Sequence, residues 1–337
     1  MTESVTLTAA EAESLILDAL LASNTSRENA APVAKALIAA EIDGQAGHGL
    51  SRVSSYCGQA RSGKVNGHAA PKAHRSAPGF VAVDADGGFA YRAMDLAIDQ
   101  VAEAAAECGI AAAAVANSHH CGQAGLHVEA LAERGCVALL FANTPKAMAP
   151  WGGDTPLFGT NPIAFAAPRA DTDPLVIDLS LSKVARGKIM AAGKRGDAIP
   201  EGWALDADGE PTTDPKAALS GSMIPMGDAK GAALSMMVEI LAVALTGANF
   251  SFEATSFFDA EGARPGVGQL LIAIDVKKTI GAGFLDRMEV LADAIAAQSG
   301  TRLPGTKRLQ NRIAAEKNGL TVSSALVSEI RSLAGKA

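Results

Sequence analysis

Two glycine-flanked histidine motifs contain the residue types and spacings that could carry out chemistry. In the first, residues 47–52 read GHGLSR, so His48 precedes Arg52 by four positions. Histidine transfers protons near neutral pH, and arginine presents a planar fork of donors to a carboxylate. If a helix begins near Leu50, His48 lies at its start and Arg52 in its first turn, and both can face one cleft. Ordinary surface residues around a glycine turn remain the alternative for this motif alone.

The second motif, NSHHCGQAG at residues 117–125, follows an apolar run that ends at Ala116. A helix is expected over about 126–134. A strand that enters a glycine-containing loop and then a helix presents free amides to an anion such as a pyrophosphate. A plain strand–helix connector explains the motif equally well. Adjacent histidines in a strand point in opposite directions, which disfavours a metal site built from His119 and His120.

Three further segments place polar groups beside expected strands or helices. Residues 159–162 (GTNP) put Thr160 at a turn, and residues 178–182 (DLSLS) end a strand shortly before Arg186. Turn chemistry explains such segments when each is taken alone. Lys230 lies near the start of an apolar helix, where a cation opposes the helix dipole. This conflict indicates either an anionic ligand nearby or simple solvent exposure.

Several classes of protein are disfavoured by the motifs that the chain lacks. No GxGxxG follows an expected strand and no Walker A motif occurs, which argues against a Rossmann half and a P-loop. The four cysteines show no CxxC spacing, so a reduced protein without a disulfide framework or structural zinc is expected. The N-terminus resembles no signal peptide, and the most apolar stretch, 232–245, is too short to span a bilayer. A cytoplasmic protein is predicted.

Composition indicates a large globular chain. Its 337 residues are 48% apolar and 19% charged, enough for two or three domains with a sizeable core. Aromatic residues make up only 4%, so the core must consist mainly of Ala, Leu, Val and Ile. The net charge of −7 argues against a nucleic-acid surface, which needs clustered cations. It leaves room for a small anionic ligand.

Hydrophobic periodicity predicts helical chain ends around a central mixed sheet, an α+β fold. Thr8 and Glu11 form a capping-box pattern at the first helix. Other helices are expected at about 31–42, 51–61, 94–108, 282–297 and 323–333, with a buried helix at 231–245. Strands are expected at 110–116, 137–142, 162–167, 175–179 and 269–274. The DGG sequence at 86–88 predicts a hairpin between 80–83 and 89–91, and 193–222 is expected to be a loop.

Taken together, these motifs resemble the non-Rossmann malate/L-lactate dehydrogenase family, which includes malate, sulfolactate and ureidoglycolate dehydrogenases and reductases of cyclic imino acids. The resemblance spans nearly the whole chain, and its most specific segments are 47–52, 117–125, 149–162 and 227–239. It implies an NAD(P)-binding domain at 76–282 with a largely antiparallel sheet. It also implies a helical substrate and dimerisation domain drawn from 1–75 and 283–337, and a homodimer.

The resemblance also implies roles for individual residues. His48 would be the proton donor, Arg52 the carboxylate clamp, and Thr160, Arg186 and Gly187 further contacts to a small carboxylate substrate. The cofactor would be NADPH or NADH, with NADPH favoured if Lys307 and Arg308 neutralise a 2′-phosphate; no metal is expected. The residues that would line the cofactor are His120, Cys121, Gly122, Gln123, Ala124, Asp178, Leu179, Ser180, Lys230, Pro304, Gly305, Thr306, Lys307 and Arg308.

Three departures from the family pattern bear on the substrate. Gly47 stands where many members have Ser, Lys188 where some imino-acid reductases have an Asp that completes a relay, and Ala229 where His is common. Ketone reduction develops an alkoxide and benefits from a tuned acid, whereas reduction of a cyclic iminium gives a neutral amine directly. A weakened relay beside an intact Arg52 therefore favours a cyclic imine.

The sequences of residues 43–48 and 227–231 most closely resemble those of Δ1-pyrroline-2-carboxylate and Δ1-piperideine-2-carboxylate reductases. The sequence thus predicts NAD(P)H-dependent reduction of a cyclic 2-imino acid, of the type that converts Δ1-pyrroline-2-carboxylate to proline. Three alternatives stay open. They are a 2-hydroxy-acid dehydrogenase acting on malate, lactate or sulfolactate, a catalytically silent relative that binds a ligand, and a metal-dependent enzyme using His119 and His120.

Overall fold

A seven-stranded, largely antiparallel sheet forms the centre of the computed structural model, which describes residues 3–336. Only β3 and β4 run parallel, because α4 (Ala90–Cys108) crosses over between them. The five strands expected outside the predicted hairpin are all present. In spatial order the strands are β2 (Lys72–Ala77), β3 (Phe80–Asp84), β4 (Ile110–Ser118), β11 (Val267–Asp275), β5 (Cys136–Ala142), β6 (Ile163–Ala167) and β7 (Leu175–Leu179).

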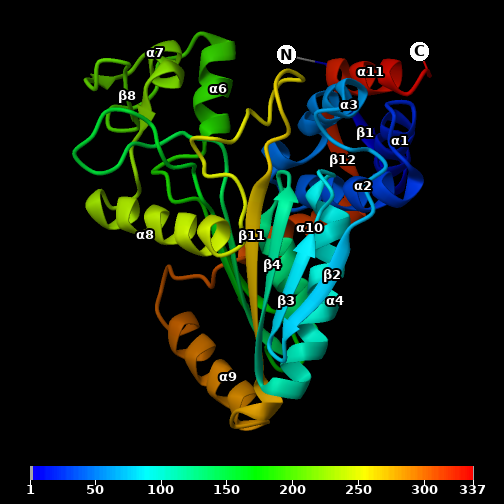
Figure 1. Ribbon diagram of the computed structural model, residues 1–337, viewed down its shortest axis with the longest axis vertical. Coiled ribbons are helices and arrows are strands. Elements are labelled where there is room, and N and C mark those ends of the chain that lie inside the picture. The colour runs from blue at the N-terminus through cyan, green and yellow to red at the C-terminus, as the bar shows by residue number, and fades with distance from the viewer. Residues whose placement is uncertain (1–2, 337) are drawn as a thin grey trace.

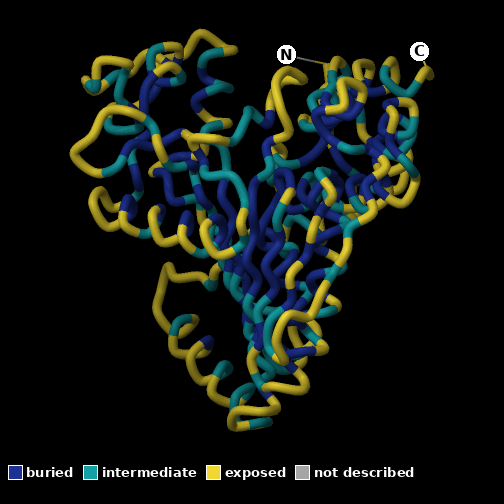
Figure 2. The backbone as a smooth tube through the Cα atoms, in the orientation of Figure 1, coloured by how far each residue is buried: buried dark blue, intermediate teal, exposed yellow. Residues whose placement is uncertain are grey.

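Small side chains allow helices to pack closely on both faces of this sheet. On one face, α4 and α5 (Ala124–Ala132) bury a core that is mostly alanine and valine. On the other face, the π-helical segment Ile240–Ala244, which continues α8 (Ala229–Glu239), packs on β4, β5 and β11. Figure 2 shows the sheet as the most deeply buried part of the molecule. The alternation of side chains along the strands supplies both cores.

The two ends of the chain meet in a helical unit beside the sheet (Figure 1). Strand β1 (Ser4–Leu7) pairs antiparallel with β12 (Leu320–Ser323), and the capping box predicted at Thr8 and Glu11 is confirmed. The helices of this unit are α1 (Ala9–Leu21), α2 (Arg27–Ile42), α3 (Val53–Ser62) and α11 (Ser324–Leu333). The expected helices at 31–42, 51–61 and 323–333 are therefore present, within a few residues.

The two helices between β11 and β12 pack in different places. Helix α10 (Thr306–Asn318) docks on the helical unit, where Arg312 pairs with Asp43 at 2.6 Å. Helix α9 (Gly283–Ala296), which follows a 3-10 turn at Val276–Lys278, lies at the opposite end of the sheet (Figure 1). There Glu289 pairs with Arg169 at 2.6 Å. The sequence assigned residues 283–337 to the helical domain. In the structure, the part of this range that packs on the N-terminal helices begins near residue 306.

The stretch expected to be a loop, 193–222, is instead part of a small lobe. It contains the end of α6 (Arg186–Arg195), all of α7 (Pro215–Ser220) and the start of β10 (Ser222–Met223). A three-stranded sheet in the order β10-β8-β9 completes the lobe, with β8 at Ala204–Leu205 and β9 at Pro211–Thr212. Elements this short carry too few residues for a periodicity signal, so the sequence showed only their turns.

The hairpin predicted across residues 86–88 is wrong. Phe89 instead precedes α4, whose buried residues Ala90, Met94 and Ala97 follow helical spacing. Asp86 and Gly87 do adopt positive φ values of 56° and 63°, but they turn the chain from β3 into this helix. The antiparallel partner of β3 is β2, the strand that directly precedes it in the chain.

The helix predicted at 231–245 is present, but its expected burial is only partial. Met236, Ile240 and Leu245 are 52%, 54% and 53% exposed, respectively. Because this segment is apolar on all sides, periodicity could not show which face would be left open. No helix within residues 3–336 combines the length and apolarity that crossing a membrane requires.

Candidate active site

Two 3-10 turns place His48 and Arg52 side by side before α3. The turns span Ala46–His48 and Leu50–Arg52, and Gly49 between them packs so closely on Glu41 that a Cβ would collide with its carboxylate. The same carboxylate accepts a hydrogen bond from the Leu50 amide at 2.9 Å. Arg52 Nε donates to the carbonyl of Gly47 at 2.7 Å. Gly49 thus permits a tight turn, and the carbonyl of Gly47 fixes the Arg52 side chain.

The structure brings the second histidine motif onto the first. The rings of His48 and His120 stack with their centroids 5.1 Å apart and an interplanar angle of 18°. Behind them, the Tyr56 hydroxyl lies 2.7 Å from His120 Nδ1 and 3.1 Å from the Tyr91 hydroxyl. Two segments far apart in the sequence therefore form one site at the junction of the helical unit and the sheet.

His119 and His120 do not point in opposite directions as adjacent strand residues would. Both follow the end of β4, and their ring centroids lie 5.0 and 5.3 Å from that of Phe257. Among residues 3–336, no cluster of three or more His, Cys, Asp or Glu side chains is arranged to hold a metal ion.

The imidazoles of this site are held in their neutral form. Burial lowers the pKa of His48 to about 4 and that of His119 to about 3, and the positive charge of Arg52 adds to both shifts. The same two causes place the pKa of His120 well below its usual value. At neutral pH the positive charge of Arg52 therefore lies beside uncharged rings.

Arg52 has no acidic partner within residues 3–336. Its Nη1 is buried and makes no hydrogen bond to any described residue. The ring of Phe258 lies against the guanidinium, with Cζ 4.5 Å from the ring centroid. A buried donor left without a partner is costly, so this edge of the guanidinium is suited to an anion from outside the protein.

Three segments expected to line a cofactor meet at the start of α5. The carboxylate of Asp178, at the end of β7, accepts a hydrogen bond from the Gly125 amide at 2.8 Å. Gly305 packs on the backbone of Val176, where a Cβ would lie 3.3 Å from the carbonyl oxygen. Arg308 donates to both carboxylate oxygens of Glu129 at 3.1 Å. Asp178 thus takes up one amide that we expected to be free, and Arg308 is already paired.

The remaining expected cofactor residues differ in exposure. Cys121, Gly122, Gln123 and Ala124 are buried, Ser180 and Thr306 are half-buried, and Leu179, Lys230, Pro304 and Lys307 are exposed. Lys307 has no ion-pair partner in the described part of the chain, unlike Arg308. It is therefore the cation of the 304–308 turn that is available to a phosphate.

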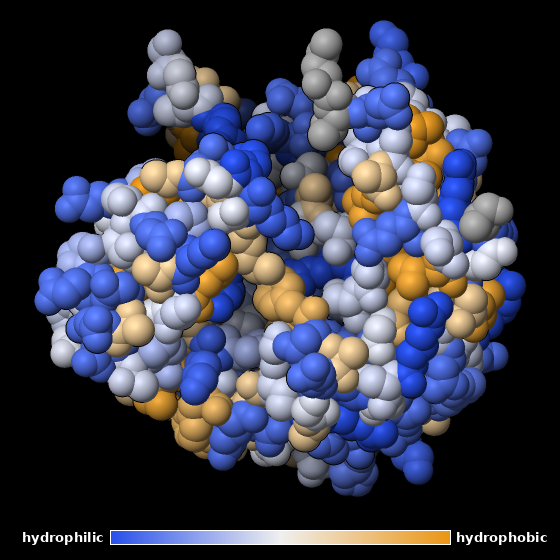
Figure 3. Space-filling model, turned by 90° about the horizontal axis from the view of Figure 1, so that it is seen from above, coloured by the Kyte–Doolittle hydropathy of each residue, from blue (hydrophilic) through white to orange (hydrophobic). Residues whose placement is uncertain are grey.

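Seen from above, the molecule is hollowed between two lobes (Figure 3). The substrate contacts expected outside the histidine site are Thr160, Arg186 and Gly187. Thr160 is half-buried and its amide donates to the Thr144 hydroxyl at 2.9 Å. Arg186 begins α6 and donates to the Leu219 carbonyl at 3.2 Å, and burial lowers the pKa of its guanidinium. Gly187 follows it and is exposed. Within residues 3–336, no hydrogen bond joins Arg186 to the histidines or to Arg52.

The three sequence departures occupy open positions. A Cβ at Gly47 would meet nothing within 4 Å, so a serine would fit without displacing a neighbour. His48 Nδ1 is buried with no hydrogen-bond partner among the described residues. Lys188 and Ala229 are exposed. No side-chain relay to His48 is therefore present in the part of the chain that the structure describes.

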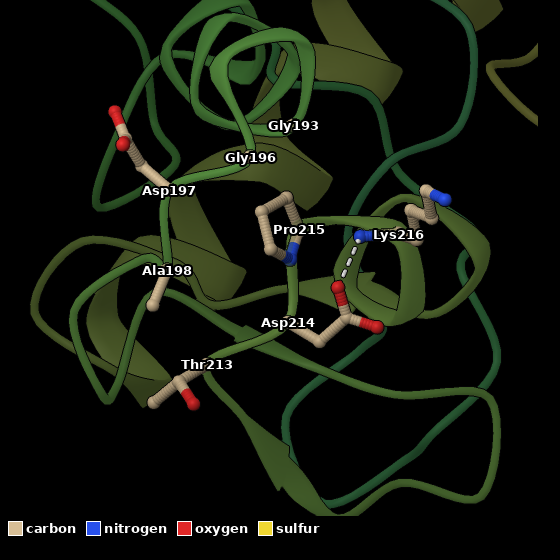
Figure 4. Close-up of a pocket in the computed structure, with 8 residues that line it drawn as sticks. All are labelled: Gly193, Gly196, Asp197, Ala198, Thr213, Asp214, Pro215 and Lys216. Atoms are coloured by element: carbon tan, nitrogen blue, oxygen red, sulfur yellow. Dashed lines mark hydrogen bonds between the residues drawn. The ribbon is translucent and has the colours of Figure 1, made fainter.

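A separate depression of about 340 Å³ lies in the α6–α7 lobe (Figure 4). Its polar wall includes Asp214, whose carboxylate accepts a hydrogen bond from the Lys216 amide at 3.0 Å and so caps α7. Asp197 in the same wall pairs with Arg195 at 2.6 Å. Each of these two carboxylates has its own partner, and no candidate site residue from the sequence lines this depression.

Sequence reasoning missed the aromatic residues of the site. Tyr56 lies four residues after Arg52, so one turn of helix separates them, and this spacing was an available signal. Tyr91 lies in the segment that we expected to be a strand. Phe257 and Phe258 belong to a loop that is far from the two histidine motifs in the sequence. Their signal was composition, since four of the ten phenylalanines fall between residues 250 and 258.

Comparison with known proteins agrees with this architecture. The family model described as malate/L-lactate dehydrogenase matches residues 7–331. A (2R)-3-sulfolactate dehydrogenase (NADP(+)) of Chromohalobacter salexigens is 52% identical over 325 residues, which are 96% of each chain. A Δ1-pyrroline-2-carboxylate/Δ1-piperideine-2-carboxylate reductase of Pseudomonas putida is 44% identical over 88% of this chain and 87% of the relative.

A solved structure shows the same fold. The Δ1-piperideine-2-carboxylate reductase of Pseudomonas syringae pv. tomato superposes with a TM-score of 0.92 at 39% identity, covering 98% of this chain and 99% of the other. Fold and sequence together define an oxidoreductase. The chain belongs to the malate/L-lactate dehydrogenase family, as the sequence predicted, and its central sheet is mixed and largely antiparallel.

Proposed function

We propose that the protein reduces a cyclic 2-imino acid with NADPH or NADH, as in the conversion of Δ1-pyrroline-2-carboxylate to proline. The observation that carries this proposal is the pairing of an unpartnered Arg52 with a neutral His48. The guanidinium offers charge and donors to a carboxylate, while the imidazole offers no proton at neutral pH. Such a site suits a substrate whose imine nitrogen is already protonated.

Arg52 binds the substrate carboxylate in this proposal. Its Nε is fixed by Gly47, so the buried Nη1 edge faces the anion. Binding the carboxylate there also holds the adjacent carbon of the imine beside His48. Placing the reacting carbon in a fixed geometry lowers the entropic part of the barrier.

His48 and its neighbours exclude water from the site and add no charge to that of Arg52. The stacked ring of His120 and the buried Phe257 cover one side of the site, and exclusion of water strengthens the pull of Arg52 on its anion. The nicotinamide supplies the hydride when it is bound. An iminium carbon that accepts the hydride becomes a neutral amine, so no protein acid is required in that step, whereas a ketone requires one.

The cofactor would lie along the segments that meet at the start of α5, namely 120–124, 178–180 and 304–308, with Lys230 nearby. Ser118 Oγ and Gln123 Oε1 beside this region are buried without a hydrogen-bond partner in residues 3–336, as expected of groups that contact a ligand. Lys307 would neutralise a 2′-phosphate. A relative named for NADP(+) at 52% identity supports NADPH as the preferred form.

A 2-hydroxy-acid dehydrogenase that acts on sulfolactate is the second candidate. Arg186 favours it, because this half-buried guanidinium has no acidic partner in the described residues and could hold a second anionic group. The Chromohalobacter relative named for sulfolactate also shares 52% identity. A substrate with a carboxylate and a sulfonate would engage both Arg52 and Arg186.

A substrate panel followed by the absorbance of the reduced nicotinamide tests the proposal. We expect oxidation of NADPH with Δ1-pyrroline-2-carboxylate at neutral pH and a lower kcat/KM with 3-sulfopyruvate, pyruvate and oxaloacetate. Robust turnover of an oxo acid without turnover of the imine would show that the second candidate, or another 2-hydroxy acid, is correct. Repeating the panel with NADH ranks the two cofactors.

We further propose that the protein is a homodimer. Met236, Ile240 and Leu245 expose apolar side chains along α8 and its continuation, and Val290 on α9 is 55% exposed. Several large apolar side chains exposed along one helix are typical of a surface that a second subunit covers. Analytical ultracentrifugation should give the mass of a dimer, and Ile240→Lys should give a monomer. A monomeric wild-type protein would exclude this proposal.

A further inference from the structure

The loop that joins the π-helical segment to β11 reaches the carboxylate clamp. Residues 250–264, here called the aromatic loop, rise from the sheet toward the helical unit (Figure 1). Phe257 of this loop packs on His119 and His120, and Phe258 lies against Arg52. The sequence motifs contain no trace of this contact, because the loop lies far along the chain from Arg52.

The aromatic loop is anchored so that Phe258 holds a fixed position. Gln59 Nε2 donates to the Phe257 carbonyl at 2.8 Å. Lys64 Nζ binds both the carboxylate of Asp259 at 2.8 Å and its carbonyl at 3.2 Å. The Lys64 side chain is almost fully buried, which favours a well-ordered pair. The residues on either side of Phe258 are thus attached to α3 and the turn that follows it.

Phe258 contacts the guanidinium without consuming its donors. An arginine donates hydrogen bonds in its plane, whereas a cation–π contact uses only the face of the group. The Gly47 carbonyl fixes the Nε edge, and the ring fixes the tilt of the plane. The buried Nη1 is left with no hydrogen-bond partner in residues 3–336.

We propose that Phe258 is a positioning residue for carboxylate recognition, because it holds the guanidinium plane of Arg52 ready for the substrate anion. The inference rests on the carboxylate clamp of the proposed function and applies to an imino acid or an oxo acid alike. Preorganisation of this kind strengthens binding by removing the cost of ordering a long side chain at the moment of association. Phe258 should therefore act on affinity for the anion and leave the hydride step unchanged.

Binding of 2-furoate, a planar ring carboxylate, and of its neutral amide 2-furamide tests the proposal by NMR titration of the full-length protein. We expect Phe258→Leu to weaken 2-furoate binding about 5-fold, the range of one cation–π contact, and to leave 2-furamide binding unchanged. Phe258→Tyr should bind 2-furoate within about two-fold of wild type. In turnover assays Phe258→Leu should raise KM with little change in kcat.

Phe252→Leu is the matched control, because Phe252 lies on the same loop with similar exposure but stacks on Phe250 instead of Arg52. It should not change 2-furoate binding. Wild-type affinity in Phe258→Leu, tighter binding on loss of the ring, an equal loss for 2-furamide, or no 2-furoate binding by the wild type would each overturn the inference. If 2-furoate binding depends on Phe258 but no imine is reduced, the proposed function fails and this inference stands.

Discussion

The two walls of the central hollow satisfy their buried polar groups differently. On the wall formed by the helical unit and β4, His48 Nδ1, both ring nitrogens of His119 and Arg52 Nη1 are buried with no partner among residues 3–336. On the opposite wall, residues 186–223 include no such atom, and Asp214 caps a helix while Arg195 pairs with Asp197. Buried polar groups are normally paired in native proteins. The first wall thus offers unpaired polar groups to a ligand, whereas the polar groups of the second wall are largely paired within the protein.

The largest effect should follow from removing the charge of the first wall. Arg52→Ala eliminates the charge and the donors that we assign to the substrate carboxylate. Loss of charge-assisted hydrogen bonds should raise KM about 100-fold for any carboxylate substrate. Steady-state kinetics measures this, and circular dichroism controls for folding. An unaltered KM would exclude Arg52 as the clamp.

His48→Ala should separate ketone reduction from imine reduction. A general acid contributes about 100-fold to a step that needs a proton, so at pH 5, where part of the His48 population is protonated, His48→Ala should lower reduction of an oxo acid by up to that factor while reduction of the imine changes little. Because the pKa of His48 lies near 4, residual ketone reduction by wild type should also rise as pH falls from 7 toward 5. Equal losses on both substrates would contradict our account of the chemistry.

Arg186→Ala tests whether the second wall contributes a charge. We expect kcat/KM for 3-sulfopyruvate to fall about 10-fold, the effect of one hydrogen-bonded charge, and kcat/KM for Δ1-pyrroline-2-carboxylate to stay near wild type. A loss on the monocarboxylate equal to that on the disubstituted anion would place Arg186 in the same clamp as Arg52. The difference between the walls would then disappear.

The smallest effect concerns the cofactor. Lys307 is exposed, so its pairing with a 2′-phosphate is screened by solvent. Lys307→Ala should raise KM for NADPH about 3-fold and leave KM for NADH unchanged. Arg308→Ala is a contrasting variant, because Arg308 is buried against Glu129 and its loss should lower stability. A preference for NADPH that survives in Lys307→Ala would remove this residue from the cofactor site.

The fold was predictable wherever a local pattern, such as the alternation of apolar residues, extends over enough residues. The strands at 110–116 and 269–274 and the capped helix after Thr8 are present because alternation and capping act locally. Short elements such as α7 were missed. The strand predicted at 89–91 was wrong because aromatic residues such as Phe89 and Tyr91 suit a strand and the buried face of a helix equally well.

The site was predictable as far as its residues lie in compact motifs. The sequence singled out His48, Arg52 and His120 because glycine turns keep each motif together. In the structure the two histidine rings stack, and the charge of Arg52 acts on His48. Phe258 could not be located, since its contact with Arg52 depends on the path of a loop that carries no periodic signal. The hydrogen bond from Arg308 to Glu129 likewise depends on tertiary packing, because the two residues lie far apart in the chain. Local patterns show which groups could react, and only packing shows which remain unpaired.

The pKa of His48 with and without a bound carboxylate tests the central claim most directly. Because the charge of Arg52 helps to hold this pKa near 4, an anion seated on the guanidinium should offset that charge and raise it. NMR titration of the His48 imidazole with saturating 2-furoate should therefore show an upward shift that is absent with 2-furamide. Saturation with 2-furoate that leaves the pKa of His48 where it was would show that the carboxylate binds elsewhere.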